Sequence, residues 1–74
     1  MEFLGNVGVG YCFLYDNALF VVQSYDWERE GYYNICIASR NREKYDVGEE
    51  FSFIEETKVE IVPVAKLKDF IPKF

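Results

Sequence analysis

ALFVVQSYDWEREGYYNICIAS, residues 18–39, contains two β-rich runs joined by a short polar connection. Residues 18–25 place Phe20 and Val22 on one face and Leu19 and Val21 on the other, which is typical of a central strand or of a strand with one face used in assembly. Residues 32–39 show the same two-residue period. Tyr33, Ile35 and Ile37 are predicted on one face of the strand, and Tyr32, Asn34 and Cys36 on the other. The stretch therefore predicts a long β-hairpin with residues 26–31 at its tip.

Further strand patterns lie on both sides of this hairpin. Residues 11–15 alternate aromatic side chains and precede Asp16-Asn17, a pair that suits a two-residue hairpin turn. Residues 50–54 and 59–64 predict two more strands around a tight polar turn, and Pro63 indicates a strand end or an edge. The glycine-rich residues 1–10 predict an irregular lead-in or one helical turn, and residues 65–70 predict one or two helical turns.

Five short strands joined by turns predict a mainly all-β fold, either a small five-stranded antiparallel barrel or a strongly bent sheet, in one domain spanning residues 1–74. Nine side chains are predicted to point inward: Phe13, Phe20, Val22, Ile35, Ile37, Phe51, Phe53, Val59 and Ile61.

The composition suggests that the aromatic side chains serve more than the core. A chain of 74 residues buries little surface, yet half of its residues are hydrophobic and 19 % are aromatic. Such an excess favours an interface, and self-association is one remedy for a small core. We therefore expect a homo-oligomer.

The charge and the cysteines narrow the classes of function. A net charge of −5 argues against unaided binding of nucleic acid, which needs clustered basic side chains. The chain has no histidine and no Cys-x-x-Cys spacing, so we expect no metal site and no cofactor. Cys12 and Cys36 are read as buried free thiols, with a disulfide as the alternative. The sequence shows no signal peptide and no membrane-spanning run, so we expect a cytoplasmic protein with no membrane partner.

No motif in the chain predicts catalysis. GNVGVG at residues 5–10 precedes a strand, whereas a phosphate-binding loop follows one. Asp26, Glu28 and Glu30 imitate half of a calcium loop, but Ile37 stands where the bidentate Glu belongs. The serines and cysteines have no histidine base, and the glutamates at residues 49–50 and 55–56 flank one short strand. We therefore expect that the protein is not an enzyme.

The aromatic, acidic hairpin tip is the predicted recognition site. Tyr25 and Tyr33 are interpreted as a structural pair at the strand ends, whereas Trp27 and Tyr32 are expected to bind a partner protein. Tyr25, Glu28 and Glu30 belong to the same predicted partner-binding site, and the charge of the two glutamates opposes single-stranded nucleic acid.

The order of residues from Val9 to Val64 resembles small SH3-like β proteins of phages, prophages and Gram-positive mobile elements, mostly of unassigned function. The resemblance rests on a few short motifs: Val9-Gly10, Phe13, Asp16-Asn17, Phe20-Val21-Val22, Phe53 and Thr57-Lys58-Val59-Glu60. It implies an SH3-like fold and an accessory role, and it implies no active site. The aromatic tip at residues 25–33 departs from that pattern.

Three hypotheses follow. The leading one is a non-enzymatic phage or mobile-element protein that binds a host protein in the host cytoplasm through the tip, for example as a defence inhibitor. The second is an oligomer that sequesters a nucleotide-like signal, with Arg40, Arg42 and Lys44 on the phosphate and Tyr32 or Tyr45 stacked on the base. The third is a structural or virion subunit.

Overall fold

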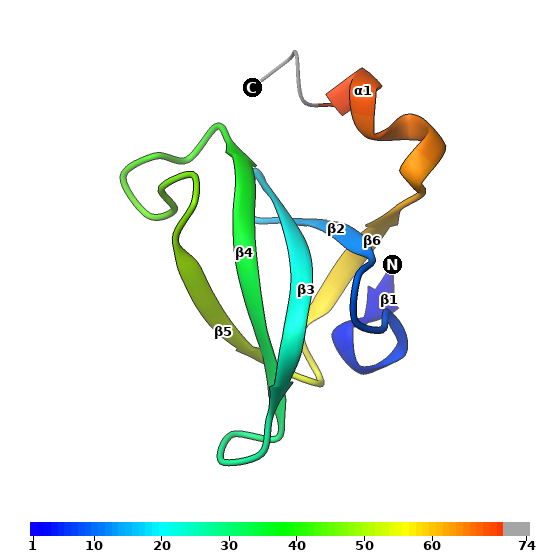
Figure 1. Cartoon of the computed structure of the whole chain (residues 1–74), viewed down its shortest axis with the longest axis vertical. Coiled ribbons are helices and arrows are strands. Elements are labelled where there is room, and N and C mark those ends of the chain that lie inside the picture. Colours follow the sequence, from blue (N-terminus) through cyan, green and yellow to red (C-terminus); the bar gives the residue numbers. More distant parts are fainter. Residues whose placement is uncertain (71–74) are drawn as a thin grey trace.

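The computed structural model describes residues 1–70 and consists mainly of β-strands, with a short helical segment near its C-terminal end (Figure 1). Six strands form one antiparallel sheet in the order β1-β6-β2-β3-β4-β5. The strands are β1 (Glu2–Phe3), β2 (Cys12–Tyr15), β3 (Ala18–Asp26), β4 (Gly31–Ser39), β5 (Glu50–Ile54) and β6 (Lys58–Val62). The helical elements are η1 (Leu4–Asn6), η2 (Val64–Lys66) and α1 (Leu67–Phe70).

The predicted turns have the backbone geometry that their residues favour. Asp16 and Asn17 join β2 to β3 with φ angles of 50° and 65°. Positive φ at both central residues is the signature of a type I′ turn, whose twist matches that of the flanking strands. β6 ends at Val62, directly before Pro63, because proline has no N–H to donate to a ladder. The hairpin turn and the C-terminal helical turn are therefore confirmed, and Pro63 does mark the end of the last strand, which stops at Val62 rather than at residue 64.

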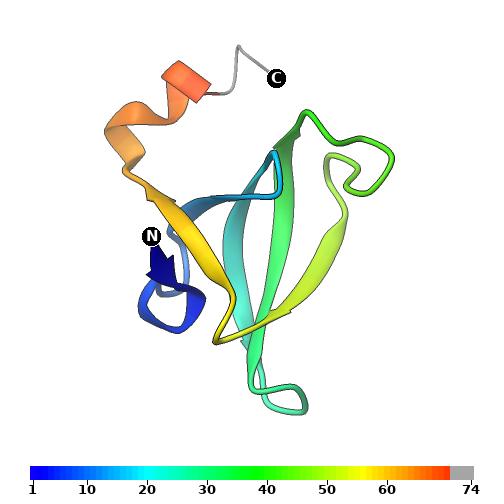
Figure 2. The same cartoon turned by 180° about the vertical axis from the view of Figure 1, so that it is seen from behind.

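The sheet is bent but open, so the predictions of a closed barrel and of five strands were wrong (Figures 1 and 2). In the described part of the chain, β5 pairs only with β4, and β1 pairs only with β6. The sixth strand is β1, which pairs Glu2 with Val59 and Phe3 with Lys58. Two residues are too few to show an alternating pattern, which is why the lead-in was predicted to be irregular.

The η1 turn connects the N-terminal edge of the sheet to the turn between β5 and β6. The backbone N–H of Leu4 donates to the carbonyl of Thr57 at 2.8 Å, and that of Gly5 donates to the carbonyl of Glu55 at 3.0 Å. The Leu4 side chain is fully buried. A helical turn, rather than a strand ladder, therefore holds this side of the bent sheet together.

The inner, concave face of the sheet carries the main core. Phe13 and Phe20 stack with ring centroids 5.3 Å apart, and Phe53 packs edge-on against Phe20 at 5.2 Å. The inner side chains of β4 are Tyr32, Asn34 and Cys36, so the prediction that Ile35 and Ile37 point inward was wrong. Ile61 shares the face of Val59 but is 41 % exposed, near the open end of the sheet.

Asn34 explains the error in β4. This side chain is fully buried, and its Nδ2 donates to the carbonyl oxygens of Tyr32 at 2.9 Å and of Phe51 at 3.2 Å. A polar residue in a strand is normally assigned to the solvent face, and here the two carbonyl acceptors allow it to lie inside. Its Oδ1 has no hydrogen-bond partner.

The outer face of the sheet carries a second, smaller apolar cluster. Its buried members are Cys12, Leu19, Ala38 and Val62, and its half-buried members are Leu14, Val21, Ile37 and Leu67. Cys12 therefore lies on the outer face, whereas Cys36 lies in the inner core. Both are buried free thiols, and burial raises the pKa of each. The free-thiol interpretation is confirmed, and the Cys12–Cys36 disulfide is excluded because the side chains lie on opposite faces.

Candidate functional site

The tip of the β3–β4 hairpin is a four-residue turn, 27–30, whose backbone is held by Asp26. Asp26 Oδ1 accepts hydrogen bonds from the backbone N–H of Glu28 at 3.1 Å and of Arg29 at 3.4 Å. Its Oδ2 accepts a hydrogen bond from the Ser52 hydroxyl of β5 at 2.9 Å. One buried carboxylate therefore orders the turn and ties it to the neighbouring strand.

The protonation of Asp26 is set by competition between burial and hydrogen bonding. Burial raises its pKa, but hydrogen bonds from Ser52, from the Arg29 and Glu28 backbone and from Tyr33 outweigh burial and lower the pKa below its usual value. The charge of Asp26, followed by burial, raises the pKa of the Tyr33 hydroxyl that contacts it. Asp26 is therefore an ionised turn-stabilising group at neutral pH.

This pKa shift predicts an acid-sensitive hairpin. Because the pKa of Asp26 is lower in the folded state than in the unfolded state, its contribution to stability is present above about pH 4 and is lost as the pH falls through the folded value. The stability difference between the wild type and Asp26→Asn should be largest near pH 7, should begin to shrink below about pH 4, and should disappear once the pH falls below the lowered folded pKa, where the wild-type carboxyl is also neutral. Urea unfolding from pH 2.5 to pH 7 measures this difference. A difference that does not change with pH would contradict the assignment.

A β-bulge in β3 places the aromatic side chains of the tip. Val22 pairs with Asn34 and Ser24 pairs with Tyr33, so β3 gains one residue between these pairs. The extra residue turns Tyr25 to the same face as Tyr32, its partner across the strands.

Three of the four aromatic residues of the tip are linked by ring contacts through Tyr25. Tyr25 packs edge-on against Tyr32, with ring centroids 5.1 Å apart, and against Trp27 at 4.6 Å. Trp27 is 83 % exposed. We call Tyr25, Trp27 and Tyr32 the tip cluster.

The structure divides the predicted tip residues differently from the sequence. Tyr32 packs in part against the inner core and pairs with Tyr25, so it supports the cluster as well as lining its surface. Tyr33 lies on the outer face, opposite Ser24, with its hydroxyl on Asp26. Trp27 is by far the most exposed of the four aromatic side chains.

Acidic side chains surround the tip cluster. Glu28 and Glu30 are exposed on the turn, and Glu30 has a positive φ of 53°. Partial burial, followed by the carboxylates of Glu55 and Glu30, raises the pKa of the Tyr25 hydroxyl. The exposed Trp27 ring is therefore presented in negatively charged surroundings, with Arg29 the one basic side chain on the turn itself.

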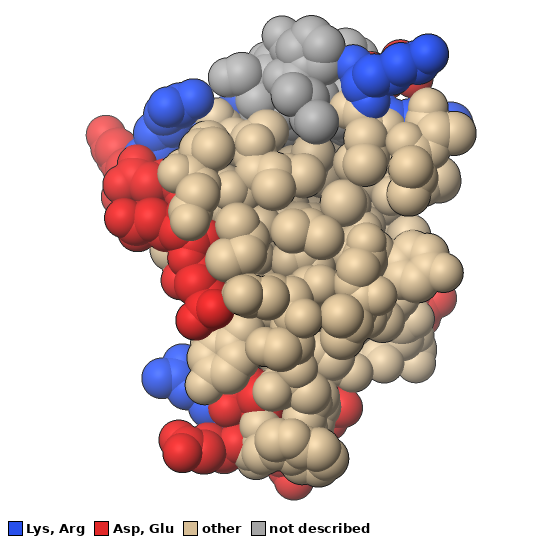
Figure 3. Space-filling view, viewed as in Figure 1, with Lys and Arg blue, Asp and Glu red and all other residues tan. Residues whose placement is uncertain are grey.

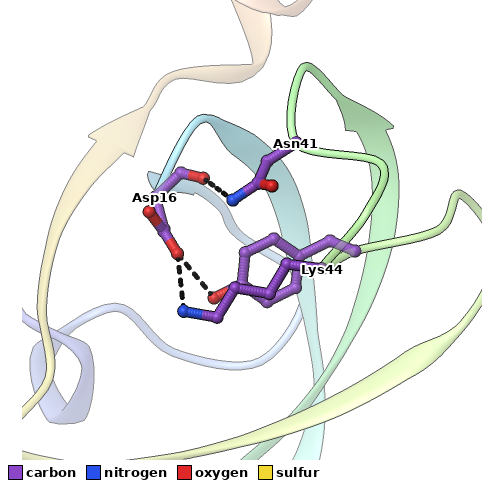
Figure 4. A network of polar contacts seen from close by, with 4 residues as sticks. Asp16, Asn41 and Lys44 are labelled. Carbon is purple, nitrogen blue, oxygen red and sulfur yellow. Dashed lines mark hydrogen bonds and ion pairs between the residues drawn. The ribbon is translucent and has the colours of Figure 1, made fainter.

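The loop predicted to bind a nucleotide is anchored to the β2–β3 turn (Figure 4). Asp16 Oδ2 accepts hydrogen bonds from Lys44 Nζ at 3.0 Å and from the Tyr45 hydroxyl at 3.1 Å. Asn41 Nδ2 donates to the Asp16 carbonyl at 3.4 Å. The hydrogen bonds from Lys44 and Tyr45 lower the pKa of the Asp16 carboxyl, and the bond to Asp16 raises the pKa of Lys44.

Tyr45 lies in the core and not on a ligand surface. Its ring is 3 % exposed and packs edge-on against Phe20 at 5.2 Å and against Phe51 at 5.0 Å. A base cannot stack on a buried ring, so the expectation that Tyr45 stacks on a nucleotide was wrong. Arg40 and Arg42 are exposed at the start of the loop, and Lys44 lies in an ion pair with Asp16.

Metal-binding clusters and membrane-spanning helices are both absent from the described residues, 1–70. Within them, no three Cys, Asp or Glu side chains converge in a way that could hold a metal ion. None of their helical segments has the length and apolar character needed to cross a bilayer.

The fold and the tip define a small, mostly β domain whose hairpin tip is held by hydrogen bonds and exposes one tryptophan. Comparison with protein-family models, with curated proteins and with solved structures finds no match to this chain.

Proposed function

We propose that this chain is a non-enzymatic binding protein that contacts a partner protein through the tip cluster, with Trp27 as the main anchor. The observation that carries the proposal is the 83 % exposure of Trp27 on a turn whose backbone is fixed by the buried Asp26. Tryptophan is the residue type most enriched among the side chains that dominate binding energy, and burying this ring in a partner would remove a large apolar surface from water.

The hydrogen bonds and ring contacts that hold the tip support this function. The Asp26 carboxylate joins the turn to β5, and Tyr25 supports the Trp27 ring from one side. A side chain already held in one arrangement loses less conformational entropy when it binds, so more of its contact energy appears as affinity. The hairpin therefore presents a prearranged anchor rather than a loose loop.

The charge around the cluster defines the partner surface. Glu28 and Glu30 flank Trp27 on the turn, and Glu55 lies beside Tyr25. A basic protein surface complements these carboxylates, whereas a phosphate backbone is repelled by them. The partner contact is accordingly a pocket or groove for an aromatic ring with Lys or Arg at its rim.

The biological setting follows from the resemblance to small SH3-like proteins of phages and mobile elements. On that basis the partner is a host protein in the bacterial cytoplasm, and this chain acts as an accessory factor such as a defence inhibitor. The same resemblance includes no active site, which agrees with a role in binding alone.

Trp27→Ala tests the proposal because it separates binding from folding. An exposed side chain contributes little to the core, so the free energy of unfolding should change by less than about 1 kcal/mol. Affinity for a partner captured from a bacterial lysate should fall by a factor of roughly 30 or more, the effect of removing a dominant contact residue. Tyr32→Ala is the poorer test, because Tyr32 packs against the inner core.

Tyr11→Ala is the matched control. Tyr11 is 56 % exposed on a different part of the molecule, so its loss should leave the affinity unchanged. Equal affinities for the wild type and Trp27→Ala, measured by isothermal titration calorimetry, would overturn the proposal.

A further inference from the structure

The outer face of β3 and β4 is an uncharged surface on a strongly acidic protein. Residues 18–25 and 31–39 contain no Asp, Glu, Lys or Arg. Figure 3, drawn from the same side as Figure 1, shows a broad surface without charge over these two strands. The chain has 21 charged side chains among 74 residues, so charged residues are not scarce in it. Their absence from these two strands is therefore specific to this part of the molecule.

The side chains of this outer face are apolar where solvent-facing strands are usually polar. Val21 and Ile35 are directly paired across the strands, and Ile37 and Leu67 extend the same surface. All four are half-buried within one chain. An antiparallel sheet with one face on the core normally has polar side chains on the other. An apolar second face therefore indicates that another surface covers it.

The two ends of this face carry opposite charge. Glu28 and Glu30 flank Arg29 at the hairpin tip, and at the far end of the molecule Lys66 lies in η2 and Lys68 lies in α1, next to Asp69 (Figure 1). Two copies packed face to face and antiparallel would bring the acidic tip of each copy to the basic end of the other. A second copy also brings no charge against the neutral centre, which an arbitrary acidic or basic partner would do.

We propose that the outer face of β3 and β4 is an isologous interface between two antiparallel copies of this chain. The molecule extends 34 Å by 26 Å across this face. An interface covering most of that area buries on the order of 600 Å² per copy, somewhat below the roughly 800 Å² per partner of a standard interface. The dimer is therefore reversible, with a dissociation constant in the micromolar range (about 1–100 µM).

The dimer leaves the rings of the tip cluster accessible, although it brings Glu28 and Glu30 of the same turn against the second copy. Tyr25 and Tyr32 point to the inner face, away from the proposed interface, because the bulge in β3 separates them from Ser24 and Tyr33. An antiparallel arrangement places the two tip clusters at opposite ends of the assembly. A partner that is itself multivalent would then be held by two contacts, which raises the effective affinity.

Ser24→Lys is the test variant, because it adds a charge to the neutral face without removing a packed side chain. Ser24 is exposed and lies opposite Tyr33 on the outer face. Sedimentation velocity from about 1 µM to about 500 µM should show a monomer–dimer equilibrium for the wild type and a monomer for Ser24→Lys. Ile61→Lys, which adds the same charge on the inner side of the sheet, should dimerise like the wild type.

Charge reversal tests the antiparallel arrangement. Glu28→Lys with Glu30→Lys, and separately Lys66→Glu with Lys68→Glu, should each weaken the dimer, and the four changes together should restore it. Any one of three results would overturn the proposal. The wild type could stay monomeric at about 500 µM, Ser24→Lys could still dimerise, or the four combined changes could fail to restore the dimer. The binding of a partner through Trp27 can be measured on the Ser24→Lys monomer, so the two proposals fail independently.

Discussion

Gly31→Ala is expected to destabilise the protein strongly, more than any other substitution proposed. Gly31 is the first residue of β4 and pairs with Ile54 of β5. A methyl group built on Gly31 would overlap the carbonyl oxygen of Phe53 and would lie 2.8 Å from the Cα of Ile54. Both neighbours are backbone atoms, which cannot move aside by changing a rotamer, so β4 and β5 would have to separate next to the hairpin tip. We expect a loss of about 3 kcal/mol or more.

A loss of this size is a large share of the stability of so small a domain, which is on the order of 4–10 kcal/mol at this chain length. Gly5→Ala is the matched control, because the added methyl group would lie 3.3 Å from the Cβ of Glu55 and no closer than 3.6 Å to a backbone atom, the carbonyl oxygen of Glu55. We expect the control to stay within about 1 kcal/mol of the wild type in urea unfolding. Equal stabilities for the two variants would show that β4 and β5 do not approach as closely as described.

Asn34→Asp is expected to have the second largest effect. The two side chains have nearly the same shape, so the substitution changes hydrogen bonding and charge without changing packing. Asn34 is fully buried and its Nδ2 donates to two carbonyl oxygens, those of Tyr32 and Phe51. A carboxylate at that place would put negative charge against both acceptors in a dry core, at a cost of about 3 kcal/mol at pH 7.

The effect of Asn34→Asp should depend on pH in a definite direction. Burial raises the pKa of the new carboxyl above its unfolded value of about 3.9, so the destabilisation is smallest below pH 4 and grows as the pH rises toward the folded value. Asn17→Asp makes the same change in the exposed β2–β3 turn and should cost less than about 0.5 kcal/mol at either pH. A destabilisation by Asn34→Asp that is equal at pH 4 and pH 7 would contradict the burial of this side chain.

Local sequence patterns predicted most of the fold because most of the fold is local. The β3–β4 hairpin alternates over long runs, and Asp16-Asn17 and Pro63 mark a turn and a strand end by their own backbone preferences. The two-residue strand β1 left no such pattern, and the open edge of the sheet depends on η1 packing against a turn 50 residues away. Bulges in β3 and β4 change which side chains share a face of the sheet. The fully buried Asn34 made the inner face of β4 look like a solvent-facing one in the sequence.

The sequence pointed to the hairpin tip as a candidate site, but it did not show which residue orders the tip. The composition of residues 25–33 marked the tip, yet the residue that orders it is Asp26, through Ser52 on a strand 26 residues away. The Asp-x-x pattern at the start of a turn was the available signal for this role. Tyr45 stood in a charged loop that looked like a ligand site, and its burial depends on Asp16 and on three core phenylalanines, which no local pattern reveals.

The central claim is that Trp27 contacts a partner protein, and site-specific photo-crosslinking in bacterial cells tests it most directly. A photoreactive phenylalanine analogue placed at residue 27 should form an adduct with one discrete host protein. The same analogue at residue 11, which is also exposed and aromatic, should form none with that protein. Adducts at residue 11 but not at residue 27, or no discrete adduct at residue 27, would contradict the account.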